Sequence, residues 1–278
     1  MISTKNKILV ARIIKIIICI FYKNTQNISV LRRGIRWKLD LNEGIDFSIF
    51  LLGCFEKGTV KALDRLIRKG DTVIDIGANI GAHTIHMAQK VSNNGRVFAL
   101  EPTDFAFKKL VQNVNINLDL SGRIKLRQIL LVDTDNDSSK EIYSSWPLIN
   151  SHDSHKVHHG VKKTIIGASK IRLDDFISFE NIVKVDLIKL DVDGNELEVL
   201  KGGIELIKKF SPIFVMELAP DQYEKKENFD KVVELLISMG YRFLSLNEKI
   251  KLPSEISLLK DKIPKNGGIN IVAKRIKT

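Results

Sequence analysis

The spacing of apolar and polar positions along this chain changes repeatedly between a period of about two and a period of about 3.6 residues. Short, largely apolar stretches bounded by turn residues are typical of buried strands, and they occur at 72–76, 96–100, 124–132, 185–190, 212–218, 241–246 and 268–274. Helical spacing occurs at 80–91, at 103–117, where Thr103 is the expected cap, and at 229–239. It also occurs in a segment that ends at 210 and contains a Gly-Gly pair at 202–203, which suggests a close crossing or a kink. Strands that alternate with helices predict a doubly wound α/β sheet.

Residues 5–23 predict an amphipathic helix, because Lys5, Arg12, Lys15 and Lys23 fall within a sector of about 80° and leave a wide apolar face. The longest apolar run, 16–22, is far shorter than the roughly 20 residues needed to span a bilayer. No small-residue cleavage site follows, which disfavours a signal peptide. Two main interpretations remain, packing against the core and peripheral contact with a membrane surface.

A hairpin and two short helices are predicted between this segment and the first strand of the sheet. Alternation on both sides of the Arg-Gly pair at 33–34 predicts the hairpin over 29–41, and the helices are expected at 45–55 and 59–68. We therefore divide the chain into two parts: an N-terminal extension, 1–44, and a catalytic domain, 45–278.

The basic charge of the chain is concentrated at its two ends. Of the net charge of +11, residues 1–40 carry +8 and residues 249–278 carry +6, which leaves −3 for the remainder. A mildly acidic core argues against a nucleic-acid partner and assigns the basic ends to a membrane surface or an acidic partner. The cysteines, Cys19 and Cys54, form neither a metal-ligand spacing nor a disulfide framework, so we expect a cytoplasmic protein.

The strongest chemical signal is a strand that ends in a carboxylate and continues into a glycine turn. Asp75 closes the apolar strand at 72–76, Gly77 and Gly81 allow the backbone to bend closely around a ligand, and a helix follows. Glu101 ends the next strand, 20 residues beyond Gly81, at the spacing expected of a ribose-binding carboxylate. The sequence therefore predicts a nucleoside ligand.

The residue between the two glycines indicates which nucleoside. Asn79 stands where a dinucleotide fingerprint has its middle glycine, which admits a pyrophosphate. The carboxylate of Asp75 suits a ligand with an ammonium group, and S-adenosylmethionine carries both an ammonium group and a ribose diol. An ordinary turn between a strand and a helix is the alternative.

Several acids are predicted to meet at the carboxyl edge of the sheet, where doubly wound proteins bind their ligands. Asp191, Asp193 and Glu196 follow one strand, and Glu217 ends the next. Acids this close repel one another unless a cation, a proton or a hydrogen-bond donor is near, which makes them candidates for acceptor chemistry. Helix N-capping by Asp193 or Asn195 is the structural alternative.

Four of the six histidines lie together at 152–159. No cysteine and no paired helical histidines accompany them, so we assign no metal to this segment. A polar loop near the acceptor and a solvated surface loop are the two interpretations that remain.

Four motifs resemble those of FkbM-type S-adenosylmethionine-dependent methyltransferases: DIGANIG at 75–81, FALEP at 98–102, IRLDDF at 171–176 and VDLIKLDVDGNELEVLKG at 185–202. The resemblance covers residues 45–247 and implies a Rossmann-like class I methyltransferase sheet of seven strands with the last antiparallel. It further implies S-adenosylmethionine as the cofactor and an oxygen acceptor on a sugar, glycan or related natural product. Asp193 departs from the usual Glu of the family, and His83 departs from its usual aromatic residue.

Two sets of site residues follow from the motifs and the strand ends. The expected cofactor-binding residues are Asp75, Gly77, Ala78, Asn79, Gly81, Glu101, Pro102 and Asp133. The expected catalytic residues are Asp191, Asp193, Glu217 and His83, with the first three as candidates for a general base or for metal ligands.

Three other functions compete with methyl transfer. A nicotinamide-dependent oxidoreductase would share the topology, although the middle glycine is absent. A nonenzymatic module would bind a nucleoside without turnover. A membrane-associated scaffold of a glycan pathway would need residues 5–23 and not the glycine turn.

Overall fold

The computed structural model describes residues 25–134, 141–144 and 161–275 of the chain. The helix predicted at 5–23 and the histidine segment at 152–159 lie outside these residues. Seven strands form the central sheet, in the order β12 (Tyr241–Ser245), β13 (Ile269–Arg275), β11 (Ile213–Leu218), β10 (Leu187–Leu190), β3 (Thr72–Ile76), β4 (Arg96–Leu100) and β5 (Ile124–Arg127).

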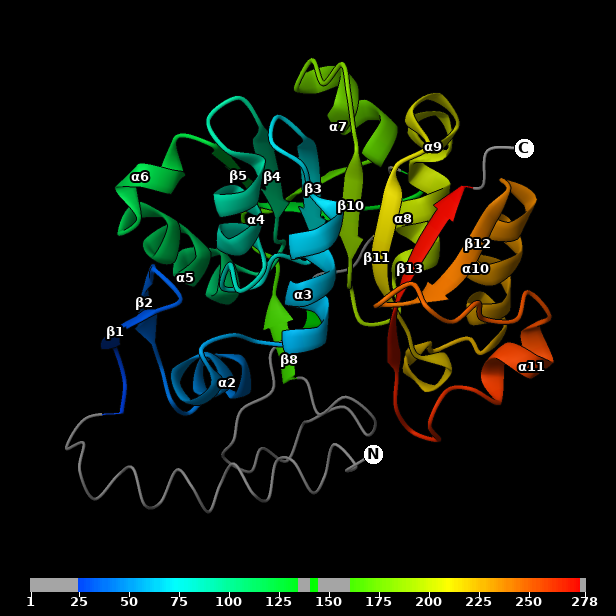
Figure 1. The fold of residues 1–278 in the computed structure, drawn as a ribbon, viewed down its shortest axis with the longest axis horizontal. Coiled ribbons are helices and arrows are strands. Elements are labelled where there is room, and N and C mark those ends of the chain that lie inside the picture. Colours follow the sequence, from blue (N-terminus) through cyan, green and yellow to red (C-terminus); the bar gives the residue numbers. More distant parts are fainter. Residues whose placement is uncertain (1–24, 135–140, 145–160, 276–278) are drawn as a thin grey trace.

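The last strand of the chain is the one that runs against the others. β13 pairs antiparallel with both β11 and β12, whereas β10, β11, β3, β4 and β5 pair in parallel. In Figure 1, β13 accordingly points up, and β10 and β12 point down. The prediction of a seven-stranded doubly wound sheet with its last strand antiparallel is confirmed.

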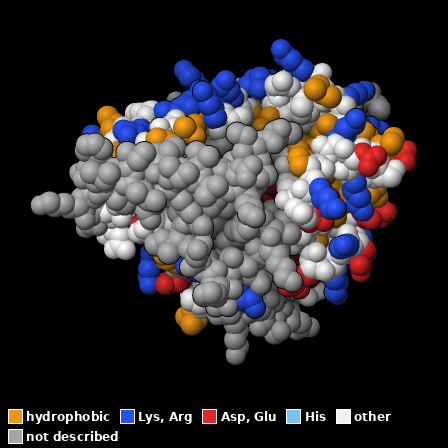
Figure 2. Space-filling view, turned by 90° about the horizontal axis from the view of Figure 1, so that it is seen from below, with side chains coloured by type: hydrophobic (Ala, Val, Ile, Leu, Met, Phe, Trp, Pro, Cys, Tyr) orange, Lys and Arg blue, Asp and Glu red, His pale blue; other side chains and the backbone are white. Residues whose placement is uncertain are grey.

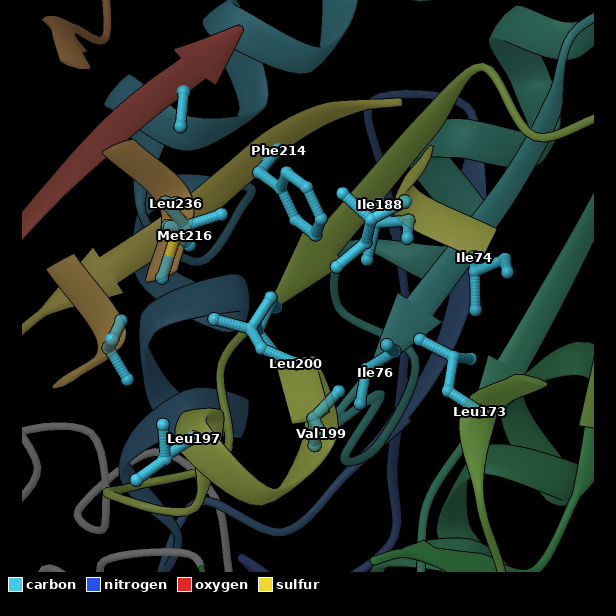
Figure 3. Packing of buried hydrophobic residues seen from close by; sticks show 14 of the residues in the cluster. Ile74, Ile76, Leu173, Ile188, Leu197, Val199, Leu200, Phe214, Met216 and Leu236 are labelled. Carbon is cyan, nitrogen blue, oxygen red and sulfur yellow. The ribbon is translucent and has the colours of Figure 1, made fainter. Parts of the chain in front are cut away.

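Helices cover both faces of this sheet and bury a separate apolar cluster on each. On one face, strand side chains such as Ile74, Ile188 and Phe214 pack against the helices α7 (Leu173–Phe179), α8 (Glu196–Gly202), α9 (Ile204–Phe210) and α10 (Glu227–Ser238). Figure 3 shows Leu200 of α8 and Leu236 of α10 directed at these strands. The other cluster includes residues of α2 (Gly44–Leu52), α3 (Lys57–Leu66), α4 (Thr84–Val91), α5 (Asp104–Asn115) and the short α6 (Leu118–Ser121).

The predicted hairpin is present and shares the second cluster. It consists of β1 (Ile28–Arg32) and β2 (Ile35–Leu39), joined through Arg33 and Gly34, which both have positive φ angles. Trp37 on β2 is buried in the cluster, and the Asn113 carboxamide accepts a hydrogen bond from the Lys38 N–H at 2.8 Å. The hairpin therefore packs as part of the catalytic core, while the division at residue 44 stays a prediction.

Two predicted elements differ from the structure in their limits. The strand expected at 124–132 divides at Gln128 into β5 and β6 (Ile129–Leu131), because β6 leaves the sheet to pair with β9 (Ser169–Ile171). Both pieces contain buried apolar residues, so the hydrophobic pattern contains no sign of the break. The helix expected from residue 80 begins only at Thr84, since Asn79 and Gly81 take positive φ angles that an α-helix excludes.

The Gly-Gly pair divides the helix that ends at 210. The chain forms α8 and α9 on either side of Gly203, and a Cβ at Gly202 would lie 2.3 Å from the carbonyl oxygen of Val132. The predicted close crossing is thus present, and Gly202 is required by it.

The remaining short elements are β7 (Glu141–Ser144), β8 (Val161–Thr164), the 3₁₀ helix η1 (Pro220–Gln222) and α11 (Ile256–Lys260). β7 and β8, which precede and follow the histidine segment in the sequence, pair antiparallel. Among the described residues, no helix is both long enough and apolar enough to cross a bilayer.

Candidate functional site

Most of the predicted site residues lie near the carboxyl ends of β3, β4, β10 and β11 or in the loops that follow these strands, whereas Asp133 follows β6. Figure 2 views the molecule from the side toward which β10 points in Figure 1. On the visible part of that side, Lys and Arg side chains gather along the upper margin and Asp and Glu side chains gather mainly toward the right. Further Lys and Arg side chains lie among the acids at the right, so both kinds of charge are present there.

The turn after β3 is held against the loop after β10. Gly77 has a φ of 79°, and a Cβ at this position would lie 1.8 Å from the carbonyl oxygen of Asp191. The N–H groups of Gly77 and Ala78 both donate to the carbonyl oxygen of Leu100 at 3.0 Å. The absence of a side chain at Gly77 thus allows three strand ends to meet, and it fixes the backbone of Asp191 next to the turn.

Asp75 lies beneath this turn. Its side chain is completely buried, and its Oδ2 accepts a hydrogen bond from the Thr84 hydroxyl at 2.6 Å. Its Oδ1 lies 3.9 Å from Nζ of Lys189. The structure therefore engages the carboxylate of Asp75 with protein groups, and its predicted contact with a ligand ammonium group stays a prediction.

Glu101 connects the glycine turn to the start of α5. Its Oε2 accepts the Asn79 N–H at 2.9 Å, and its Oε1 accepts both the N–H and the hydroxyl of Thr103, at 2.9 and 2.6 Å. Burial raises the pKa of Glu101, although these hydrogen bonds oppose the change. A carboxylate offers about four acceptor positions. Three are used here, so Oε2 retains capacity for a further donor.

A hollow opens between the glycine turn, Glu101 and β6. Its polar lining comes from the loops at the strand ends: Gly77, Asn79, Glu101, Asp193 and Asn195. Its apolar lining includes Ile129, Leu130, Leu131, Ile142, Val192 and Val199, together with Pro102. The structure thus brings four predicted cofactor-binding residues, Gly77, Asn79, Glu101 and Pro102, to one hollow.

The described lining leaves out four predicted cofactor-binding residues: Asp75, Ala78, Gly81 and Asp133. Gly81 faces the core, where a Cβ would lie 2.9 Å from a methyl group of Leu110. Asp133 forms a partly exposed ion pair with Lys201 at 3.8 Å. Ala78 is buried beside the turn.

The predicted acidic residues do converge. Asp191, Asp193 and Glu217 each place a carboxylate oxygen within 4.8 Å of the other two. Burial and the neighbouring acids raise the pKa of Asp193 and of Glu217 well above the ordinary carboxyl value. The Gln222 amide donates to Glu217 at 3.1 Å. Three carboxylates so arranged could hold a divalent cation, or share protons and leave one of them as a base.

Lys189 is the functional residue that the sequence analysis did not select. It lies on β10, it is 4% exposed, and its Nζ lies 3.1 Å from Oδ2 of Asp191. Its ammonium group supplies the positive charge that the acidic residues were expected to need. The signal was present in the sequence, because a lysine inside an otherwise apolar strand is rarely buried without a partner.

Glu196, the first residue of α8, and Asn195 before it contact the loop after β10 rather than join the acidic group. Oε1 of Glu196 lies 3.3 Å from the Val192 N–H and 3.4 Å from the Gly194 N–H. Asn195 occupies the N-cap position of α8, without a side-chain capping bond to that helix. Glu196 therefore holds the turn that presents Asp193, whose own φ of 50° is left-handed.

His83 is buried next to Glu56, an acid that the sequence analysis also did not select. Its Nε2 lies 3.5 Å from Oε2 of Glu56, and Oε1 of Glu56 accepts the Asn270 amide at 2.9 Å. Burial would raise the pKa of Glu56, but His83, Lys189 and Asn270 outweigh it and lower this pKa to about 2. Glu56 therefore carries a negative charge at neutral pH beside His83 and Glu217.

The pattern of motifs in this site can be compared with known families. Residues 75–243, which span the glycine turn, Glu101 and the acidic residues, match the family model of the methyltransferase FkbM domain. The chain belongs to this family. The resemblance noted in the sequence is thereby confirmed.

Several known proteins are similar to this chain. Hexuronic acid methyltransferase AglP of Haloferax volcanii is 29% identical over 160 residues, which cover 58% of this chain and 61% of AglP. The 2-O-methyltransferase NoeI of Sinorhizobium fredii is 27% identical over 187 residues, covering 62% of this chain and 74% of NoeI. An O-methyltransferase from Bacillus cereus, solved in complex with SAH, matches at 14% identity and a TM-score of 0.48, over 80% of this chain and 82% of that one. The match thus spans less than two thirds of AglP.

The hollow of this FkbM-family chain fits the adenosine part of the cofactor that the family implies. The buried Oδ1 of Asn79 has no hydrogen-bond partner among the described residues, so a ligand N–H or O–H would satisfy it. Oε2 of Glu101 has room for a ribose hydroxyl, and the apolar side chains of β6 suit the faces of a base.

Proposed function

We propose that the protein transfers a methyl group from S-adenosylmethionine to a hydroxyl group of a sugar, glycan or related natural product. The observation that carries the proposal is the adjacency of two groups of residues in an FkbM-family chain. The hollow at Asn79 and Glu101 also includes Asp193 in its lining, and Asp193 lies beside Asp191 and Glu217. Cofactor residues and candidate proton acceptors thus share one edge of the sheet.

The sugar class of the acceptor is supported by the relatives. AglP is named for a hexuronic acid and NoeI for a 2-O position. The first name points to an acidic sugar as the acceptor and the second to an oxygen as the methylated atom, and the site of this chain carries carboxylates and amides that can bind hydroxyl groups.

On the cofactor side, Glu101 would bind a ribose hydroxyl, Asn79 would accept a hydrogen bond from a neighbouring N–H or O–H of the ligand, and the residues of β6 would pack against the adenine. When bound, S-adenosylmethionine supplies an electrophilic methyl group whose carbon–sulfur bond breaks as the acceptor oxygen bonds to carbon. The chain has to orient the acceptor hydroxyl and to accept its proton.

Asp191 is the acid that we assign as proton acceptor. Its carboxylate lies 3.1 Å from the ammonium group of Lys189, which holds it in place beside Asp193 and Glu217. The raised pKa of Asp193 and of Glu217 leaves these two acids with protons that they can donate to other acceptor oxygens.

An oxidoreductase would use the turn differently. A dinucleotide pyrophosphate binds the free N–H groups of the glycine turn, but here the Asn79 N–H donates to the carboxylate of Glu101 at 2.9 Å. An acid at that position repels a phosphate. The hydrogen bonding of the turn thus favours a nucleoside over a dinucleotide.

Calorimetric titration tests the cofactor assignment, and labelled-methyl transfer tests the reaction. We expect S-adenosylmethionine and S-adenosylhomocysteine to bind and NAD not to bind. Label from S-adenosylmethionine should appear in glycan extracts in the presence of the protein. Binding of NAD alone would support the oxidoreductase, and binding of S-adenosylmethionine without transfer to any extract would support a nonenzymatic module.

A further inference from the structure

Lys189 carries a buried ammonium group whose neighbours are all protein oxygens. Its Nζ donates to Oδ2 of Asp191 at 3.1 Å and to the carbonyl oxygen of Gly77 at 3.3 Å. The third neighbour is Oδ1 of Asp75, at 3.9 Å. The first two contacts are hydrogen bonds and the third is an ion pair, so Lys189 links Asp191, the Gly77 turn and Asp75.

The surroundings of Lys189 keep it charged. Burial by itself lowers the pKa of a lysine, but Asp191, Asp75 and Glu56 outweigh burial here and raise the pKa of Lys189 above its ordinary value. A buried lysine that keeps its charge is poorly suited to accept a proton. Its position suits it to hold other groups in place.

The two groups that Lys189 joins are those that the proposed reaction must align. Gly77 belongs to the turn that lines the cofactor hollow, and Asp191 is the assigned proton acceptor. Their backbones are already adjacent, because the Asp191 N–H donates to Ile76 at 3.2 Å and a Cβ at Gly77 would strike the Asp191 carbonyl oxygen. These backbone contacts leave the Asp191 carboxylate free to rotate.

We infer that Lys189 is a positioning residue that fixes the carboxylate of Asp191 relative to the Gly77 turn. The inference rests on the proposed function, in which Asp191 accepts the proton of the acceptor hydroxyl. Loss of the ammonium group would leave the Asp191 side chain without its fixed partner, and the cost would appear in turnover through Asp191.

A double-mutant cycle with Lys189→Met and Asp191→Asn tests this coupling. We expect Asp191→Asn to lower kcat by about 10²–10⁴-fold, as for a lost general base, and Lys189→Met to lower it by at least about tenfold. In the Asp191→Asn background, Lys189→Met should change kcat by less than about threefold, because residues that act as a unit are not additive. Losses that multiply, or unchanged kcat in Lys189→Met, would overturn the positioning role.

Matched variants separate positioning from general stability. Lys184 precedes the same strand and pairs with Asp186 at 3.0 Å, but it is 53% exposed, so Lys184→Met should keep kcat within about twofold. Lys189→Arg keeps the charge and should retain more kcat than Lys189→Met. If Lys189→Met fails to fold, Lys189→Gln takes its place against Lys184→Gln, and equal kcat in these two variants would contradict the role.

Amide hydrogen exchange gives a measurement that needs no acceptor. We expect exchange in residues 77–81 and 191–194 to be faster in Lys189→Met than in the wild type, and unchanged in Lys184→Met. Unchanged exchange in Lys189→Met would overturn the inference even in an active enzyme. A wild type that transfers no methyl group would refute the proposed function instead, while the exchange result would still decide whether Lys189 joins the two loops.

Discussion

Replacement of Gly77 by alanine tests the tight junction between the cofactor turn and the loop after β10. The added Cβ would lie 1.8 Å from the carbonyl oxygen of Asp191, whereas real Cβ contacts stay beyond 3.0 Å. Both partners are backbone, so one of the two loops has to move by more than about 1 Å, in a core that transmits such strain. An L-residue at the φ of 79° costs a further 1–2 kcal/mol or so.

Gly70→Ala is the matched control for this substitution. Gly70 has a φ of 87°, but a Cβ there would have no heavy atom within 4 Å. We therefore expect Gly70→Ala to lower the free energy of unfolding by about 1–2 kcal/mol or less, and Gly77→Ala to lower it by more than about 3 kcal/mol. The difference between the two isolates the collision with Asp191.

Urea unfolding and calorimetric titration measure the two consequences. Besides the lower stability, Gly77→Ala should weaken S-adenosylmethionine by more than about tenfold, which is 1.4 kcal/mol, while Gly70→Ala should leave the affinity unchanged. Equal stability and equal affinity in the two variants would contradict the close contact between Gly77 and the Asp191 backbone.

Three further predictions address the carboxylates and the N-terminal residues. Glu101→Ala should weaken S-adenosylmethionine by about 1–3 kcal/mol, because it leaves polar partners unpaired; unchanged affinity in a calorimetric titration would contradict the ribose assignment. Burial, with Asp191 and Asp193, raises the pKa of Glu217 well above 4.5 in the folded protein. The folded protein therefore keeps a proton that the unfolded chain releases, and the free energy of unfolding should fall as the pH rises from the unfolded pKa towards the folded pKa. Denaturant titrations should show a weaker fall in Glu217→Gln, and an identical pH dependence would contradict this. A chain that begins at Thr25 should lose salt-sensitive binding to anionic vesicles that the full chain shows, and keep its cofactor affinity; full-length protein that ignores vesicles at low salt would refute the membrane contact.

Local sequence signals were sufficient for most elements of the fold. The hairpin at Arg33 and Gly34, the cap at Thr103 and the close crossing at Gly202 each depend on the conformational preference of a few neighbouring residues. The structure contains all three, including the hydrogen bond that the Thr103 side chain accepts from the Ala106 N–H. The division of 124–132 at Gln128 depends on pairing with β9, which the local pattern does not contain.

The candidate site was predicted in part, for a similar reason. The convergence of Asp191, Asp193 and Glu217 follows from the rule that parallel strands end at one edge, and the structure brings these acids together. Glu56 is 214 positions from its partner Asn270, so no spacing rule could connect the two. Asp75 is buried under the turn, where it accepts a hydrogen bond from Thr84. Thr84 is the first residue of α4, whereas the apolar pattern predicted that this helix begins at residue 80.

The most direct test of methyl transfer to a hydroxyl group combines labelled transfer with base treatment of the product. The wild-type protein, S-adenosylmethionine with a labelled methyl group, and a glycan extract are incubated together, and the labelled product is then exposed to mild base. A methyl ether on a hydroxyl survives this treatment, whereas a methyl ester on a carboxylate is hydrolysed. We predict label that withstands base and that is strongly reduced with Asp191→Asn; label released by base, or no label transferred at all, would contradict the proposed reaction.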